Sequence, residues 1–231
     1  IFANKIYVSF KDSLKYFNIK KTIHIGNVIR KDIFVKNITQ NTDKDVVNLF
    51  NIDINKPIIY VSGGSLGSHL LNEKMFSCID SLLDSYRVLL QTGSNEIFKD
   101  FEKANEIKLN LSSEKQNGFV IKKYIDSNSI GYVLNNMDIF VGRSGANTVY
   151  ELGVLKKFSL LIPIPWGTHN EQYLNAKVLE DIGLANILEE KYLNHSDLKE
   201  EIDKLRECIK IREIKTERVE NLFPANAATR L

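Results

Sequence analysis

The segment PIIYVSGGSLGS, residues 57–68, decides how this chain folds. Its first half is a short apolar run, and its second half places three glycines and two serines before a stretch with helical spacing. This pattern predicts a buried strand that ends in a tight corner and continues into a helix. Such a corner is either a turn and nothing more, or a loop whose bare backbone amides point at an anion.

The same alternation of apolar runs and amphipathic segments repeats along the chain. Strands are predicted at residues 5–9, 21–25, 58–62, 88–92, 119–122, 139–142, 159–164 and 185–188. Helices are predicted at 67–84, 95–108, 129–136, 145–155, 170–182 and 196–210. Short apolar strands separated by helices indicate an α/β fold, with a Rossmann-like parallel sheet covered by helices on both faces.

The polar stretch 36–56 predicts a short helix and a loop that lead into the main sheet. We therefore expect residues 1–35 to be the tail of a preceding domain with a linker, and residues 36–215 to form the ligand-binding domain. Residues 216–231 are expected to be a C-terminal tail that docks on the missing domain. Its last residues, NLFPANAATRL, have no clear partner and are expected to be ordered only by contact with something else. Since the chain begins at Ile1 without a methionine, we expect a fragment or a separate subunit.

The composition argues against several classes of function. The 231 residues carry 31 basic and 29 acidic side chains, and no dense Lys/Arg block alternates with aromatics, which argues against a nucleic-acid surface. Cys78 and Cys208 lack the paired spacing of a disulfide framework or a zinc site, and they suit a reducing compartment. No apolar run approaches the roughly 20 residues that span a bilayer.

A second corner rich in small residues follows the apolar run 139–142. In GRSGANTVYE, residues 142–151, Gly145 stands at the expected start of another helix. Because the carboxyl ends of parallel strands meet at one edge of a sheet, both corners should face one crevice, where two helix N-termini would bind a diphosphate. Neither corner matches the P-loop or a full G-x-G-x-x-G fingerprint, so a dinucleotide is not favoured.

Acidic and amide side chains near these corners are candidates for binding sugar hydroxyls. Glu151 lies about one and a half turns into the second helix, where a carboxylate can accept both hydroxyls of a ribose. Alternatively, it is a first-turn acid that faces solvent. The segment PIPWGTHNEQYLNAKVLE, residues 163–180, opens a helix with Glu171, Gln172 and Asn175, which could bind a second sugar. The His-Asn pair before them could also simply cap that helix.

The four histidines, His24, His69, His169 and His195, show no spacing typical of metal ligands. We expect His24, His69 and His195 to be structural, while His169 lies near the candidate sugar site. No metal and no other cofactor is therefore expected.

Five motifs together resemble the MurG family. They are GNVIR (26–30), GGSLGS (63–68), YID (124–126), GRSGANTVYE (142–151) and PIPWGTHNEQYLNA (163–176), in the family's order and at its spacing. MurG enzymes are bacterial glycosyltransferases that add N-acetylglucosamine to lipid I to make lipid II in peptidoglycan synthesis. The resemblance covers residues 1 to about 190 and concerns the donor-binding C-terminal half. It implies a GT-B architecture, in which two Rossmann-like domains enclose the substrate crevice.

The resemblance implies a role for each matching residue in binding the donor, UDP-N-acetylglucosamine. Arg30 and Ser65 would meet the diphosphate, and the backbone of Ile125 would meet the edge of uracil. Glu151 would bind the ribose, Gln172 the N-acetylglucosamine hydroxyls, and Asn175 would support Gln172. The remaining residues, which would line the diphosphate, are Gly63, Gly64, Gly145, Ala146, Asn147 and Thr148.

Four positions depart from the family's usual residues. Val28 stands in place of proline, Leu66 in place of glutamine, Ser68 in place of alanine, and Glu171 in place of a frequent glutamine. None of these changes removes a principal ligand, so they bear on fine specificity and not on donor binding.

The family's N-terminal domain, with its proposed catalytic base and its acceptor and membrane surfaces, has no counterpart in these residues. We expect the chain to supply the donor-binding half of a cytoplasmic enzyme, peripheral on the inner face of the plasma membrane, and to be poorly active alone. The lipid-linked acceptor would bind through the other domain. Two alternatives stay open: a non-catalytic UDP-sugar-binding subunit that needs a partner chain, and a UDP-sugar epimerase, for which no acid/base set is evident.

Overall fold

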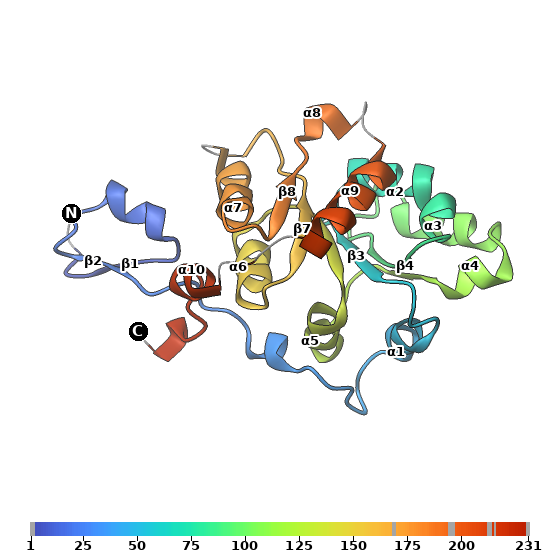
Figure 1. The fold of residues 1–231 in the computed structure, drawn as a ribbon, viewed down its shortest axis with the longest axis horizontal. Helices are drawn as coiled ribbons and strands as arrows, with labels where there is room; N and C mark the ends of the chain where they lie inside the picture. The colour runs from blue at the N-terminus through green and yellow to red at the C-terminus, as the bar shows by residue number, and fades with distance from the viewer. Residues whose placement is uncertain (1–2, 168–169, 194–196, 212–213, 215, 230–231) are drawn as a thin grey trace.

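The computed structural model describes residues 3–167, 170–193, 197–211, 214 and 216–229 (Figure 1). The strands are β1 (Ile6–Val8), β2 (Thr22–His24), β3 (Ile58–Ser62), β4 (Arg87–Gln91), β5 (Phe119–Lys122), β6 (Ile139–Gly142), β7 (Phe158–Leu161) and β8 (Ala185–Ile187). The α-helices are α1 (Lys44–Asn51), α2 (His69–Leu82), α3 (Asp100–Leu109), α4 (Ser113–Asn117), α5 (Ser127–Asn136), α6 (Ala146–Val154), α7 (Glu171–Glu180), α8 (Glu190–Leu193), α9 (Leu198–Ile211) and α10 (Thr216–Leu222). Short 3-10 helices are η1 (Lys11–Tyr16), η2 (Lys31–Phe34) and η4 (Ala227–Thr229).

The main sheet of the described residues is six-stranded and parallel, in the order β5-β4-β3-β6-β7-β8. In the centre of this sheet, Ile59 of β3 is in register with Val88 of β4 and with Ile139 of β6. The chain steps outward from β3 to β5, returns to β6 beside β3, and then steps outward to β8. The strand order therefore reverses between β3 and β6, which is where ligands bind in folds of this type.

Two hydrophobic layers cover the sheet. In β3, Ile58 and Tyr60 face one layer, while Ile59 and Val61 face the other. The first layer contains side chains of α1, α5, α6 and α7, and the second contains side chains of α2, α3 and α9. Figure 1 shows α1 and α5 below the sheet and α2 and α9 above it. The predicted α/β fold with helices on both faces is confirmed.

Some predicted element bounds differ from the structure. The helix predicted over 95–108 begins only at Asp100, since the preceding segment is bound to the first glycine corner, where the Ser94 N–H donates to the Ser65 carbonyl (3.0 Å). The strand predicted over 159–164 ends at Leu161. Periodicity also missed α4, α8 and α10, because helices of four to seven residues are too short to show a period.

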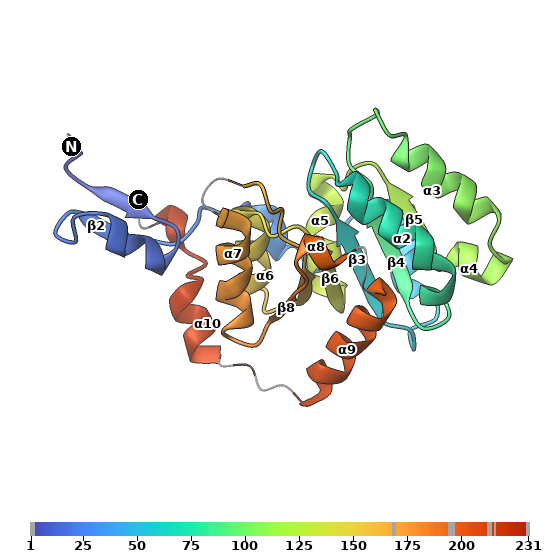
Figure 2. The same cartoon turned by 90° about the horizontal axis from the view of Figure 1, so that it is seen from above.

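The C-terminal segment packs against this chain's own helix α6. The ring of Phe223 lies over Gly153 and meets the Tyr150 ring edge-on at 5.2 Å, and the Tyr150 hydroxyl donates to the Pro224 carbonyl (3.0 Å). Phe223 is only 3% exposed. The expectation that this segment has no partner within the chain is therefore wrong. Lys11 of η1 donates to Asn221 of α10 (3.4 Å), and Figures 1 and 2 show the N-terminal strand pair and α10 on the same side of the main sheet.

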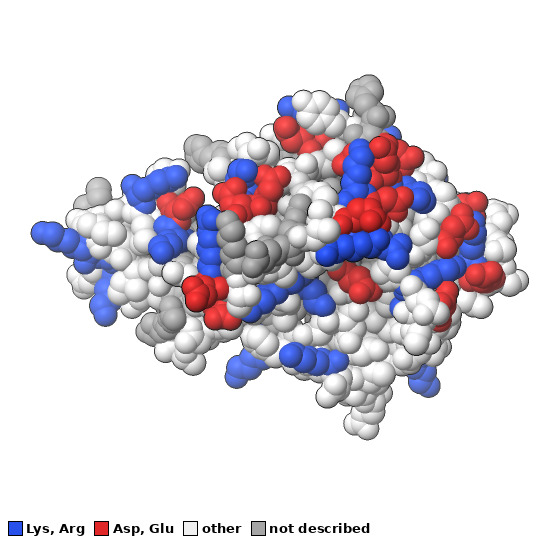
Figure 3. Space-filling view, viewed as in Figure 1, with Lys and Arg blue, Asp and Glu red and all other residues white. Residues whose placement is uncertain are grey.

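Charges of both signs are interspersed on the face shown in Figure 3. On α9, Lys199, Lys204 and Lys210 each pair with an acidic residue three or four positions away. This arrangement is typical of a solvated helix face. Among the helices that the structure describes, none combines the length and the apolar composition that a membrane span requires.

Candidate functional site

A cavity of about 480 Å³ opens at the carboxyl ends of β3 and β4, next to α6. It lies where the strand order reverses, and both glycine corners border it. Its lining includes many of the residues selected from the sequence: Arg30, Gly64, Ser65, Ile125, Asn147, Thr148 and Glu151. The structure thus brings together segments that are more than 100 residues apart in the chain.

The first corner is both a tight turn and an open loop. Gly67 has a φ of +83°, and a Cβ there would lie 2.0 Å from the Thr92 carbonyl oxygen, so only glycine fits against the next loop. Gly64 also has a positive φ, of +92°, but no atom lies within 4 Å of its Cβ position. Tight packing on one side therefore holds a backbone segment that stays open to a ligand on the other side.

The second corner places the N-terminus of α6 at the cavity. Gly145 is the N-cap of this nine-residue helix, and no side chain caps it. The first N–H groups of a helix have no acceptor within the helix, so those of Ala146, Asn147 and Thr148 are suited to an anion. The Asn147 side chain also accepts a hydrogen bond from Asn27 (2.8 Å), which joins the N-terminal segment to this corner.

Arg30 and Glu151 form a two-point ion pair in the lining of the cavity. Arg30 Nε donates to Glu151 Oε1 (2.8 Å), and a terminal nitrogen donates to Oε2 (3.0 Å). Burial alone would lower the pKa of Arg30, but the hydrogen bond and charge of Glu151 raise it overall. The family resemblance implies that Arg30 meets the diphosphate and that Glu151 meets the ribose; in this structure the two side chains contact each other.

The segment after Arg30 is anchored on α5. The Asn135 side chain donates to the Ile33 carbonyl (2.6 Å), and a Cβ on Gly131 would collide with the Asp32 carbonyl oxygen. Helix α5 therefore fixes the direction in which residues 26–30 enter the cavity.

Gln91, at the end of β4, links three parts of the cavity. It was not among the site residues predicted from the sequence. Its Oε1 accepts hydrogen bonds from the Tyr60 hydroxyl (2.9 Å) and the Ile125 N–H (3.1 Å), while its Nε2 donates to the Gly64 carbonyl (3.1 Å). Burial raises the pKa of Tyr60, which keeps its hydroxyl protonated as a donor. A polar residue that ends an apolar run and precedes Thr-Gly is a signal that could have identified Gln91.

Gln172 and Asn175 lie at the second corner but not in the lining of this cavity. Ser144 Oγ donates to the Gln172 carbonyl (2.8 Å), and Asn175 Nδ2 donates to the Ser144 carbonyl (3.2 Å). Gln172 Oε1 accepts the Ile164 N–H (3.3 Å). Helix α7 is thereby fixed to the residues before α6. His169 and His195 lie outside the described residues.

His69, Glu73 and Asp100 bring an imidazole and two carboxylates within 4.8 Å of one another. Each group already has a partner: His69 Nδ1 lies 2.7 Å from Asp100 Oδ1, Asn72 donates to Asp100 Oδ2 (2.7 Å), and Lys103 donates to Glu73 (2.7 Å). These bonds join α2 to α3, and His69, Glu73 and Asp100 all take part in them.

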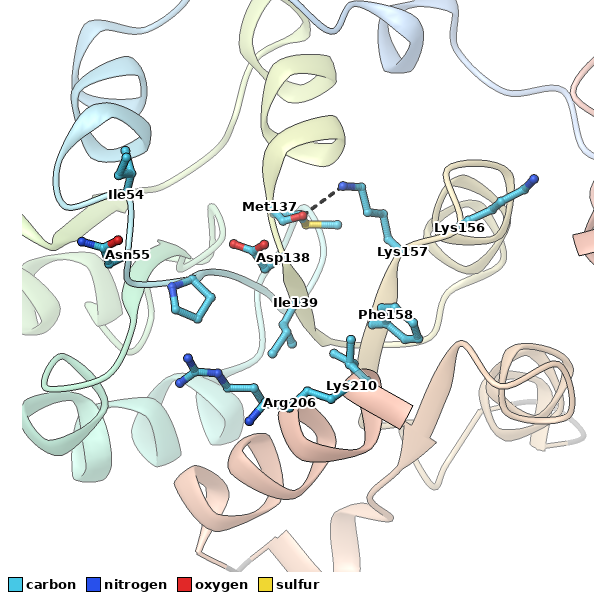
Figure 4. Close-up of a pocket in the computed structure, with 12 residues that line it drawn as sticks. Ile54, Asn55, Met137, Asp138, Ile139, Lys156, Lys157, Phe158, Arg206 and Lys210 are labelled. Carbon is cyan, nitrogen blue, oxygen red and sulfur yellow. Dashed lines mark hydrogen bonds between the residues drawn. The ribbon is translucent and has the colours of Figure 1, made fainter. Parts of the chain in front are cut away.

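A second cavity, of about 570 Å³, lies at the opposite edge of the sheet, where β3, β6 and β7 begin (Figure 4). Lys157 donates to the Asn135 and Met137 carbonyls (2.6 and 3.0 Å), and Lys156 pairs with Glu220 (3.1 Å). Figure 4 shows Lys156 directed away from the cavity. Both lysines therefore have partners within the chain.

Comparison with known proteins adds relatives to this geometry. The chain is 30% identical over 207 residues to the UDP-N-acetylglucosamine--N-acetylmuramyl-(pentapeptide) pyrophosphoryl-undecaprenol N-acetylglucosamine transferase of Clostridium novyi, and 31% identical to that of Finegoldia magna. These matches cover 88% of this chain but 53% and 52% of the relatives. The chain thus spans about half the length of the curated relatives it matches.

Solved structures share the fold. The crystal structure of Acinetobacter baumannii MurG matches 98% of this chain and 56% of its own, with a TM-score of 0.59 and 19% identity. The Methanocaldococcus jannaschii UDP-GlcNAc 2-epimerase, solved in complex with UDP-GlcNAc and UDP, matches 99% of this chain and 59% of its own, with a TM-score of 0.57 and 16% identity. At these identities, the similarity shows the fold alone.

The family model of the glycosyltransferase family 28 C-terminal domain matches residues 58–230, which include the main sheet and both glycine corners. The chain belongs to this glycosyltransferase family.

Proposed function

We propose that this chain binds UDP-N-acetylglucosamine as the donor half of an enzyme that transfers N-acetylglucosamine to a lipid-linked muramyl pentapeptide. The observation that carries the proposal is the cavity itself, in which two glycine corners and the buried carboxylate of Glu151 meet. The named relatives, which are N-acetylglucosamine transferases, support the choice of sugar.

The nucleoside would lie between Ile125 and Glu151. The Ile125 N–H is already bound to Gln91, so its carbonyl is the backbone group that can accept the N3–H of uracil. Cytosine has no proton at N3 and would present an acceptor to an acceptor. The two oxygens of Glu151, oriented by Arg30, retain lone pairs that can accept both ribose hydroxyls.

The diphosphate would lie between the two corners. The first-turn amides of α6 and the open backbone at Gly64 and Ser65 supply donors for its oxygens, together with the positive ends of two helix dipoles. We propose that these groups bind the diphosphate without a metal ion. In the transfer reaction, the same donors would stabilise the negative charge that develops on the UDP leaving group.

The remaining steps would require groups that these residues do not supply. Deprotonation of the acceptor hydroxyl needs a general base, and we propose that it and the lipid-linked acceptor site belong to the half of the enzyme outside the matched region. We also propose that the assembled enzyme acts in the cytoplasm at the inner face of the plasma membrane, where such an acceptor would be found.

Calorimetric titration of the chain with UDP-N-acetylglucosamine, UDP-glucose, ADP-glucose, UDP and CDP tests the proposal. We expect UDP-N-acetylglucosamine to bind best and CDP to bind at least about fivefold more weakly than UDP, since one hydrogen bond is replaced by repulsion. Addition of EDTA should leave the affinity unchanged.

Glu151→Ala should lower the affinity for UDP-N-acetylglucosamine by about tenfold or more, because a charged hydrogen-bond acceptor is removed. The matched control is Glu106→Ala, an exposed glutamate on α3, which should bind as the unaltered chain does. Binding of no uridine nucleotide at millimolar concentration would contradict the proposal, as would equal binding of ADP-glucose.

A further inference from the structure

Arg143 is a buried arginine at the end of β6, between the two glycine corners. It is 8% exposed, and its terminal nitrogens donate to the Ile162 carbonyl (3.0 Å) and to Ser68 Oγ (2.7 Å). The second of these nitrogens also forms an ion pair with Glu190 at the start of α8. Burying a charge costs free energy unless the charge is paired and hydrogen-bonded, so the partners of Arg143 indicate its role.

These partners belong to different parts of the candidate site. Ser68 is the N-cap of α2 and closes the first corner, but its side chain makes no capping bond and is instead the acceptor for Arg143. Ser144, which follows Arg143 in the chain, binds α7 through its hydroxyl and its carbonyl. Residues 143 and 144 therefore connect the first corner, α7 and α8 to the residues that lead into α6.

We propose that Arg143 is a positioning residue that sets the spacing between the two phosphate-binding corners through its bond to Ser68. This inference rests on the proposed binding of a uridine diphosphate sugar. The planar guanidinium has fixed donor directions, so it holds Ser68, Ile162 and Glu190 at fixed relative positions. A diphosphate needs donors from both corners at once, and a change in their spacing removes part of its contacts.

The nucleoside end of the site is held by other residues. Gln91 fixes Ile125 and Arg30 fixes Glu151, and neither pair contacts Arg143 through a hydrogen bond among the described residues. Ser68 stands where the family usually has alanine, a departure that was expected to leave donor binding unaffected, but its bond to Arg143 gives it a part in that binding in this chain. Loosening this link should therefore weaken diphosphate binding and leave nucleoside binding unchanged. A merely structural role would lower both affinities together or neither.

The test compares UDP and uridine on three variants of the full chain, by calorimetry for UDP and by NMR titration for uridine. Ser68→Ala removes only the acceptor for Arg143, since the hydroxyl caps nothing. We expect UDP to bind about fivefold more weakly to Ser68→Ala, as for one lost hydrogen bond to a charged group, with uridine unchanged. Arg143→Lys keeps the positive charge beside Glu190 but loses the second terminal nitrogen that lets arginine bond to Ile162 and Ser68 at once. It should therefore lower the UDP affinity further.

The matched control is Ser81→Ala, an exposed serine on the same helix α2 whose hydroxyl bonds only to its own helix. This variant should bind UDP and uridine as tightly as the unaltered chain does. If Ser68→Ala and Arg143→Lys fold and bind UDP as tightly as the control, the positioning role is wrong. An equal loss of UDP and uridine would also overturn it. If the unaltered chain binds neither ligand, the proposed function fails first.

Discussion

Arg30 and Glu151, which are 121 residues apart in sequence, form a bidentate ion pair in the lining of the candidate donor cavity. Glu151 comes from α6 and Arg30 from the segment before η2, so the pair joins the N-terminal part of the chain to the main sheet. The side chain of Glu151 is only 10% exposed, and Arg30 fixes the direction of both its oxygens.

This pair predicts how Arg30 contributes to binding. If Arg30 acts by orienting Glu151, Arg30→Lys should lower the affinities for uridine and for UDP by the same factor, about fivefold. Lysine cannot make the two parallel hydrogen bonds that hold both carboxylate oxygens. Paired NMR and calorimetric titrations measure the two factors. A loss confined to UDP would instead place Arg30 at the diphosphate, as the family resemblance implies. Lys31→Ala, which changes an exposed neighbouring cation, is the control.

Gly67 and Gly64 allow a matched test of the first corner. Gly67→Ala places a methyl group 2.0 Å from the Thr92 carbonyl at a positive φ, whereas Gly64→Ala has a positive φ but open space. We expect Gly64→Ala to lower the free energy of unfolding by about 1–2 kcal/mol, the cost of the left-handed backbone. Gly67→Ala should lower it by clearly more. Equal free energies of unfolding for the two variants, measured by urea denaturation, would show that the contact between the loops is not tight.

Asp43 predicts a pH-dependent contribution to stability. Burial alone would raise its pKa, but the bond to Lys122 and the N–H groups of Val46 and Asp45 lower it overall. A carboxyl whose pKa is lower in the folded state stabilises the protein above its unfolded pKa, and this stabilisation is lost as the pH falls through the folded pKa.

The test is Asp43→Asn, which can still cap α1 but carries no charge. At pH 7 it should be less stable than the unaltered chain by about 0.5–1 kcal/mol, and the difference should shrink as the pH is lowered below about 4. Chemical denaturation across this pH range measures it. A difference that is independent of pH would contradict the prediction, and Asp12→Asn, at an exposed site, should show no difference.

Phe223 predicts that the C-terminal segment stabilises this chain. Its ring is buried against Gly153 and Tyr150, so Phe223→Ala should lower the free energy of unfolding by about 3–5 kcal/mol. Phe17→Ala, at a side chain that is 48% exposed, should have a much smaller effect. If both variants unfold at the same denaturant concentration, the packing of the segment on α6 adds nothing to stability.

Much of the fold could be predicted from local patterns. The predicted strands 58–62, 119–122 and 139–142 match β3, β5 and β6 at both ends. Strands buried on both faces are continuous apolar runs, and the glycines after them follow from the need for sharp corners. The parallel arrangement then places both corners at one edge, so the cavity between Gly64 and Glu151 was predictable in outline.

The sequence by itself thus determined the alternation of elements, the class of sheet and the edge at which the candidate cavity opens, because burial and turn geometry leave local signals. The tertiary structure alone decided which polar groups meet. It paired Arg30 with Glu151, made Gln91 the link between Tyr60 and Ile125, and directed Arg143 to Ser68. Such contacts join residues 30 to more than 100 positions apart, and their partners depend on strand order and helix packing, which no local spacing encodes.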